Sequence, residues 1–305
     1  MTPVFFLFLI ISALLIIRER RIIRLIINLG IFSLISSACF LLLCAPDVAL
    51  AEIVVSVFST IVFVAAFEKY YNSAGRFTGA RRPAPKESFI IPAVFIALVF
   101  ALYVYFIPVD PYNPSLKELY LSSFAGEVGG ENAVTAIYLG YRVYDTLFEA
   151  LMLLVSIVAV IHLSRYEDLA ASRGVPSGIQ GSALAQTTIQ LISPMMIIIC
   201  VYLVMNGHLT PGGGFHGGVV AASLFVCRFL IYDIYDIPVG KVITVEKLLF
   251  IGILLLATLF VFSGMSARFL ALRIPYMVSM NLLIGLKVTC GFLIIFYRFT
   301  AFERV

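Results

Sequence analysis

Charged residues are scarce in this sequence. Only 12% of its 305 residues are Asp, Glu, Lys or Arg, and 62% are hydrophobic. A soluble domain has about 25% charged residues, so this composition excludes an ordinary water-soluble fold. It predicts a polytopic membrane protein with little chain left over for a soluble catalytic domain. We therefore expect that the protein has no catalytic centre of its own.

Motifs for metals and disulfides are also lacking. The five cysteines lie inside or at the ends of apolar runs and form no CxxC pair. This favours small buried hydrophobic side chains over disulfides or metal ligands. No residue set suits nickel, haem or an iron–sulfur cluster, so we expect no resident metal or cofactor in this chain.

Long apolar runs divide the chain into about nine predicted transmembrane helices. The runs are continuously apolar rather than alternating, which indicates helices and not a barrel. The first run is short and has no cleavage-site pattern, so we interpret it as a span and not as a signal peptide. The runs lie at residues 3–17, 25–45, 48–67, 89–109, 146–163, 187–206, 214–232, 248–267 and 274–297.

Basic residues are unevenly shared between the connecting loops. The loops after the first, third, fifth and seventh runs and the C-terminus hold most of the Lys and Arg residues. The positive-inside rule then predicts an outside N-terminus and a cytoplasmic C-terminus in the cell membrane. Two polar loops, Tyr71–Ser88 and Ser164–Gly181, predict three domains of three, two and four helices at residues 1–80, 81–180 and 181–305.

A lysine lies deep in the last run. Ile274–Tyr297 is 24 residues long, and Lys287 lies 10 residues from its end, about 15 Å into the helix. A charge in a membrane costs about 2.5–3.5 kcal/mol and usually faces a protein interior or an aqueous path. Lys287 therefore needs a polar or anionic partner, either for structure or for ion transfer. The expected partners are Glu52, Asp145 and Glu149.

The stretch APDVALAE, Ala45–Glu52, joins the second and third runs. Pro46 favours a helix break or the first turn of a helix, and Asp47 is placed either to cap that helix or to take part in ion transfer. Glu52 lies at least one turn into the run. Desolvation there would favour its protonated form and suits a proton carrier.

The stretch Glu131–Ala150 carries three charges at helical spacing. Arg142, Asp145 and Glu149 share one helix face just before an uninterrupted apolar stretch. A structural salt-bridge ladder would have the same spacing. At a membrane entrance, however, the arrangement favours a proton or cation relay, because the arginine can hold one acid ionised while its neighbour titrates.

A glycine-rich segment, NGHLTPGGGFHGG, lies between the sixth and seventh runs. We expect a tight, non-helical turn there, and a role in close helix packing or in proton transfer by its histidines. It lacks the GK[ST] of a phosphate loop, and two histidines without a third ligand are a weak metal signal. The residues of interest are His208, Pro211, Gly212, Gly213, Gly214, His216, Gly217 and Gly218.

Together these segments resemble the membrane arm of Mrp-type (Mnh) multisubunit Na+/H+ antiporters and of the energy-converting hydrogenases built on the same arm. NGHLTPGGGFHGG and the later MNLLIGLKVTCGFLIIF resemble the antiporter B-type subunit. APDVALAEIVVSVFSTIVF and ENAVTAIYLGYRVYDTLFEA are similar to modules at the C-terminal end of the large A-type subunit. The chain would then be a fusion equivalent to the D, E and F subunits of archaeal membrane-bound hydrogenases and sulfur reductases.

The resemblance implies a transport subunit that helps form a Na+ or H+ path beside other antiporter subunits. Asp47, Glu52, Arg142, Asp145, Glu149 and Lys287 would line or control that path. Partners would be other Mrp-type subunits and hydrogenase-like peripheral-arm subunits. The alternative is a non-conducting scaffold that braces the antiporter-like subunits. The sequence leaves open which cation moves and whether a redox reaction drives it.

Overall fold

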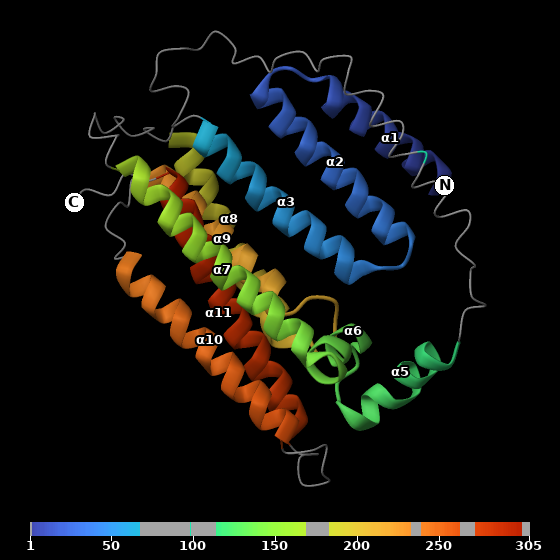
Figure 1. The fold of residues 1–305 in the computed structure, drawn as a ribbon. Coiled ribbons are helices and arrows are strands. Elements are labelled where there is room, and N and C mark those ends of the chain that lie inside the picture. Colours follow the sequence, from blue (N-terminus) through green and yellow to red (C-terminus); the bar gives the residue numbers. More distant parts are fainter. Residues whose placement is uncertain are drawn as a thin grey trace.

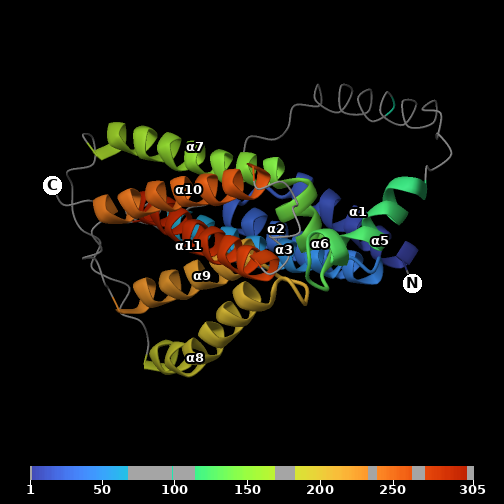
Figure 2. The same ribbon diagram turned by 90° about the horizontal axis from the view of Figure 1, so that it is seen from below.

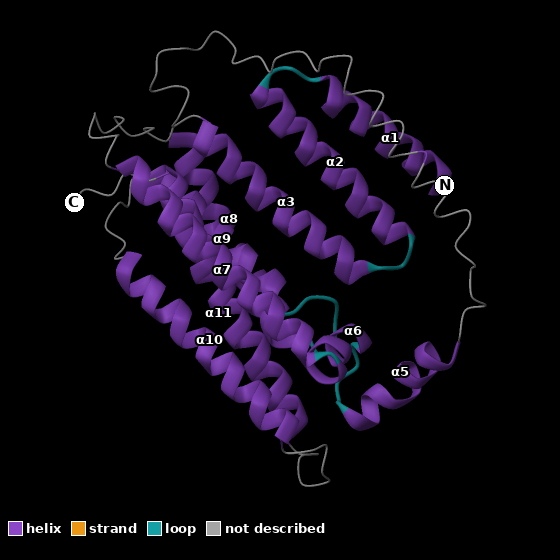
Figure 3. Ribbon diagram, viewed as in Figure 1, coloured by secondary structure: helices purple, strands orange, loops and turns teal. Residues whose placement is uncertain are grey.

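The computed structural model describes residues 2–67, 98, 114–168, 183–232, 239–262 and 272–300. Within these ranges the regular elements are helices joined by short turns (Figure 3). They are α1 (Thr2–Arg18), α2 (Ile22–Leu42), α3 (Pro46–Phe67), α5 (Pro114–Glu127), α6 (Ala133–Ala136), the π-helix η3 (Ile137–Tyr141), α7 (Val143–Asp168), α8 (Ala183–Asn206), α9 (Gly214–Tyr232), α10 (Val239–Phe262) and α11 (Arg273–Thr300).

Seven helices in the described part of the chain are long and apolar enough to cross a membrane, namely α2, α3, α7, α8, α9, α10 and α11. The first predicted run forms α1, a shorter apolar helix. The fourth run, 89–109, lies outside the described residues apart from Leu98. The all-helical membrane fold is thus confirmed, whereas the count of nine and the orientation of the termini stay predictions.

The helices form a layer and a bundle that lie side by side (Figures 1 and 2). In the layer, α1 packs on α2 and α2 on α3. In the bundle, α11 is central, because it contacts α7, α8, α9 and α10. The layer joins the bundle where α3 packs against α9 and α11. The seam between the layer and the bundle is therefore the contact of α3 with α9 and α11.

Glycines let α9 and α11 approach closely. A Cβ atom on Gly218 would lie 2.6 Å from the carbonyl oxygen of Gly285 on α11. Glycine at such a crossing lets two backbones come into contact, which is how many membrane helices associate. An aromatic core continues along the same contact, where Phe229 packs edge-on against Phe296 at a centroid distance of 5.4 Å.

A π-helical turn separates α6 from α7. Its widened backbone leaves carbonyls to be satisfied by side chains: Thr146 Oγ1 donates to Tyr138 O at 2.5 Å, and Tyr276 OH donates to Leu139 O at 3.0 Å. Such turns are rare and are often found at functional sites. The turn ends at Arg142, so Asp145 lies in the first turn of α7.

Candidate functional site

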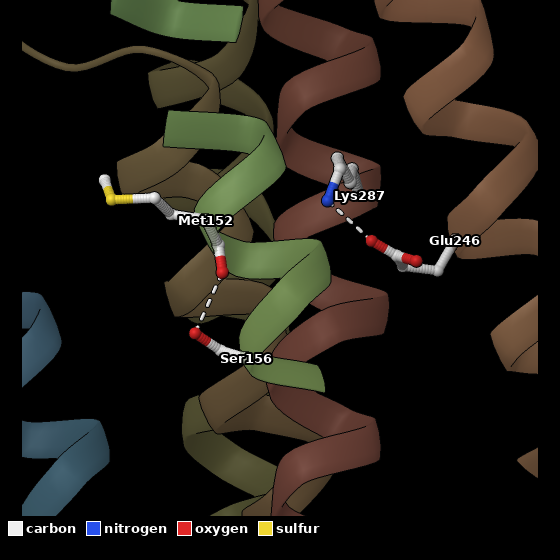
Figure 4. Close-up of polar contacts among 4 residues, drawn as sticks. All are labelled: Met152, Ser156, Glu246 and Lys287. Atoms are coloured by element: carbon white, nitrogen blue, oxygen red, sulfur yellow. Dashed lines mark hydrogen bonds and ion pairs between the residues drawn. The ribbon is translucent and has the colours of Figure 1, made fainter. Parts of the chain in front are cut away.

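Lys287 forms a buried ion pair with Glu246. The Lys287 Nζ lies 2.5 Å from Glu246 Oε1, and both side chains are 1% exposed. Figure 4 shows the two side chains pointing toward each other from α11 and α10. The expectation that Glu52, Asp145 or Glu149 would pair with Lys287 was wrong. Helix α10 begins at Val239 and not at residue 248, so Glu246 lies within the helix instead of in a loop.

The surroundings of the pair are largely apolar. The Lys287 ammonium lies 5.5 Å from the centre of the Phe250 ring, close enough for a cation–π contact. Glu246 Oε2 is buried and has no hydrogen-bond partner among the described residues. Removing one member of such a pair strands the other charge in a dry interior. Lys287 is thus satisfied inside the bundle, as a structural pairing requires.

The glycine-rich segment forms the expected tight turn between α8 and α9. Gly212 has φ 149° and Gly213 has φ 123°, values that favour glycine. A Cβ atom on Gly213 would lie 2.5 Å from the Tyr138 hydroxyl, and one on Gly214 would collide with the carbonyl oxygen of Asn281. Glycine is therefore required here by backbone conformation and by space.

Two further glycines follow at the start of α9. A Cβ atom on Gly217 would lie 3.0 Å from the carbonyl oxygen of Cys200 on α8. The Cys200 thiol also donates to Gly217 O at 3.3 Å. Gly217 thus packs on α8 and Gly218 on α11, which confirms the packing interpretation for these residues. Pro211 lies exposed in the turn.

The turn is tied to the α6 region by hydrogen bonds. The backbone amides of Glu131 and Asn132 donate to His208 O at 2.9 and 3.0 Å. The Asn132 side chain donates to Gly207 O at 3.2 Å, and Thr135 Oγ1 donates to the same oxygen at 2.6 Å. These bonds satisfy backbone carbonyls that a non-helical turn would otherwise leave unpaired in a membrane.

Asn281 connects the same turn to α11. Its Oδ1 accepts from the Gly214 amide and from the Tyr138 hydroxyl, both at 3.1 Å, and its side chain is fully buried. Burial raises the pKa of Tyr138 to about 12, so its hydroxyl stays protonated as the donor. Sequence reasoning missed Asn281, although a single amide within a largely apolar run was a signal.

Asp47 ties the three-helix layer to the turn. Its Oδ1 accepts from the Gly212 amide at 3.0 Å. Its backbone carbonyl lies 3.2 Å from His216 Nε2. Since a carbonyl only accepts, Nε2 carries the hydrogen. The start of α3 at Pro46 is confirmed, and the Asp47 carboxylate bonds to the glycine-rich turn.

Both loop histidines retain a buried nitrogen without a partner among the described residues. These atoms are His208 Nδ1 and His216 Nδ1. Within the described ranges no group of three His, Cys, Asp or Glu side chains is placed to hold a metal ion. Through its two contacts with the turn, Asp47 is nevertheless brought together with Gly212 and His216.

Asp145 and Glu149 near the start of α7 are exposed. Arg142 forms an ion pair with Asp145, and the two side chains are 63% and 54% exposed. Glu149 is also exposed, whereas Val143 and Ala150 are buried. This ion pair is the salt bridge that the spacing of Arg142 and Asp145 allows. Glu52 on α3 is half-buried.

These features define a class: an all-helical integral membrane protein. Its glycine-rich turn is joined to α3, α6 and α11 by polar contacts. Two family models match the chain. Residues 7–71 match the MbhD family, the D subunit of MBH, and residues 184–299 match the "Domain related to MnhB subunit of Na+/H+ antiporter". Over these two segments the chain is thus similar to Mrp/Mnh-type membrane modules.

Individual relatives agree with these families. The chain is 28% identical over 150 residues to antiporter subunit mnhA2 of Staphylococcus saprophyticus, a match that covers 49% of this chain and 18% of that protein. It is 30% identical over 160 residues to mnhA2 of Staphylococcus haemolyticus, covering 51% of this chain and 19% of that protein. The chain thus spans less than a fifth of these curated relatives.

Two solved structures share the fold. One is the Mrp complex of Dietzia sp., with a TM-score of 0.75, 18% identity and coverage of 99% of this chain and 35% of that one. The other is the archaeal membrane-bound sulfane sulfur reductase, a respiratory membrane complex, with a TM-score of 0.57 and 26% identity. That match covers 68% of this chain and 94% of the other chain. Both solved structures are multisubunit assemblies.

Proposed function

We propose that this chain is a membrane subunit of an Mrp-type complex and contributes carboxylates to a Na+ or H+ path. Such a subunit carries no catalytic centre of its own, and the transported ion is its only small ligand. Its partners are other antiporter-like subunits and, where a redox reaction drives transport, hydrogenase-like peripheral subunits. The N-terminus lies outside and the C-terminus in the cytoplasm, with the protein in the cell membrane.

One observation carries this proposal: Glu149 is exposed on a helix long enough to span the membrane. A charged side chain within a spanning helix costs up to about 2.5–3.5 kcal/mol against lipid, the value at the helix centre. This cost is avoided where water, ions or a partner subunit lie beside it. Half-buried Glu52 on α3 supports the same conclusion. The path then follows the outward surfaces of α3 and α7.

Lys287 has a different place in this proposal. Lys287 is paired with Glu246 inside the bundle, and each of the two side chains is only 1% exposed. We therefore assign Lys287 to the stability of the bundle or to electrostatic control of the path, and not to its wall. Asp47 holds the glycine-rich turn and lies where the layer meets the bundle.

A scaffold without conduction is the second candidate. It is favoured by the sealed Lys287–Glu246 pair and by the polar contacts that the turn makes with α3, α6 and α11. Both candidates predict a stable assembled complex. They differ in whether the outward carboxylates matter for transport.

The deciding experiment replaces Glu149 by Gln in the assembled complex. Gln keeps the size and the hydrogen-bonding oxygen but cannot ionise. We expect Na+/H+ exchange in inverted membrane vesicles to fall by about tenfold or more while the complex still assembles, as typical for loss of a proton-transfer group. Glu118→Gln is the matched control, because Glu118 is an exposed acid on the short helix α5. Full exchange activity in Glu149→Gln would leave the scaffold as the function.

A further inference from the structure

Helix α7 has one buried and one outward face. Its buried face packs on α10 and α11. Four large side chains on the outward face are exposed by 59% to 65%: Tyr144, Phe148, Met152 and Val155. In Figure 4 the Met152 side chain points away from the Lys287 side of α11.

Glu149 lies within this outward face. It is six residues after Val143, where the span begins, and so is about 9 Å along the helix. The nearest basic side chain on the same helix face, Arg142, is bonded to Asp145. Lys287, the cation within the last span, is buried and paired with Glu246. Within the described residues, Glu149 therefore forms no ion pair.

We propose that the outward face of α7 docks a transmembrane helix of another subunit, and that this helix places a Lys, Arg or His side chain opposite Glu149. The inference rests on the proposed membership in a multisubunit complex, but it does not depend on ion transport. Charge complementarity is the physical reason. A carboxylate at this depth is stabilised by a basic side chain, and the flanking Phe148 and Met152 supply the apolar contact area that excludes water.

Other occupants fit this face less well. Lipid tails fit the apolar side chains but offer no hydrogen-bond donor for a carboxylate. A second copy of this chain cannot supply its mid-span Lys287, which is 1% exposed and already paired. The apolar run 89–109 of the same chain contains no Lys, Arg or His. A separate subunit remains the occupant whose chemistry matches.

Photocrosslinking in the intact complex tests the contact. A benzophenone side chain is placed at Phe148 or Met152, the complex is irradiated in its native membrane, and the crosslinked peptides are identified by mass spectrometry. We expect adducts with a spanning helix of another subunit that carries a basic residue. Adducts only with lipid, with a second copy of this chain, with residues 89–109 or with a helix lacking a basic residue would each overturn the proposal.

Charge variants give an independent measurement. Glu149→Leu should lower the co-purified partner subunit by about tenfold or more, because the partner's buried basic side chain loses its hydrogen-bond acceptor as well as its counter-charge, whereas Glu149→Gln keeps an acceptor oxygen. Replacing that basic residue by Leu as well should restore co-purification. Phe148→Leu, which keeps an apolar side chain, is the control and should co-purify nearly as well as the unchanged protein. Normal co-purification of Glu149→Leu contradicts the docking proposal, whereas loss of transport alone in Glu149→Gln bears only on the ion path.

Discussion

The carboxylate of Asp47 accepts a hydrogen bond from the backbone amide of Gly212 at 3.0 Å, across 165 positions of sequence. The bond joins the APDVALAE stretch to the glycine-rich turn, the two motifs that resemble different antiporter subunits. It crosses the seam where the three-helix layer meets the bundle (Figure 1). Asp47, which the sequence predicts to line an ion path, thus links the three-helix layer to the bundle.

Two substitutions at Asp47 separate its charge from its hydrogen bond. Asp47→Asn keeps an oxygen for the Gly212 amide, so we expect the complex to assemble normally. Asp47→Ala leaves that amide without its partner and should lower stability by about 1–3 kcal/mol. The measurement is the melting temperature of the purified complex. Equal losses in both variants would show that the charge and not the bond holds the seam.

Transport in the same two variants tests the role of the charge. If Asp47 acts only on the turn, Asp47→Asn should exchange Na+ for H+ at the normal rate. If Asp47 belongs to the ion path, the exchange rate should drop in Asp47→Asn despite an unchanged melting temperature.

Breaking the Lys287–Glu246 pair should destabilise the bundle strongly. Glu246→Gln or Lys287→Met alone leaves one charge buried without its counter-charge, at a cost of about 3–5 kcal/mol. The double variant Glu246→Gln with Lys287→Met removes both charges and should recover most of that stability. A double-mutant cycle on thermal unfolding measures the coupling. Additive losses would contradict the pairing seen here.

Gly214→Ala should disrupt the contact of the turn with α11. The new methyl group would collide with the backbone carbonyl of Asn281, which cannot move aside as a flexible side chain could. We expect loss of the folded complex from the membrane, measured by immunoblot after mild detergent extraction. Gly240→Ala is the control: nothing lies within 4 Å of its new Cβ atom. Alanine at that helical position should be neutral or stabilising by up to about 1 kcal/mol. Similar losses in both variants would argue against a steric cause.

Substitutions at Asn281 and at Tyr138 should differ in how much stability they cost. Asn281→Ala leaves both the Gly214 amide and the Tyr138 hydroxyl without their acceptor, so we expect a loss of about 2–4 kcal/mol. Tyr138→Phe removes only one of these bonds and should cost about 1 kcal/mol. Thermal unfolding of the purified complex gives both values. A larger loss in Tyr138→Phe would mean that the hydroxyl and not the amide organises this junction.

Some site features followed from sequence because they depend on local chemistry. Pro46 starts α3 as expected, and Arg142 pairs with Asp145 three residues later, because both relationships are set within one or two turns of helix. The non-helical glycine-rich turn was also predictable, since a proline and consecutive glycines disfavour helix wherever they lie.

Other features could not be read along the chain. The lysines near Glu246 obscure the start of α10, so the sequence places this acid in a loop and misses the partner of Lys287. Glu149 and Asp145 were expected to meet the bundle's own charges. They face outward because Val143, Thr146 and Ala150 occupy the buried face of α7.

Apolar content and run length alone determined that this chain is a helical membrane protein, because a bilayer leaves an apolar segment few other ways to satisfy its backbone. They also determined that a lysine would need a counter-charge at membrane depth. Which carboxylate supplies it, and how Asn281 joins three segments, was decided only by packing. Helices far apart in sequence select their neighbours by shape, and that selection places Glu246 opposite Lys287 while leaving Glu149 on the outer surface.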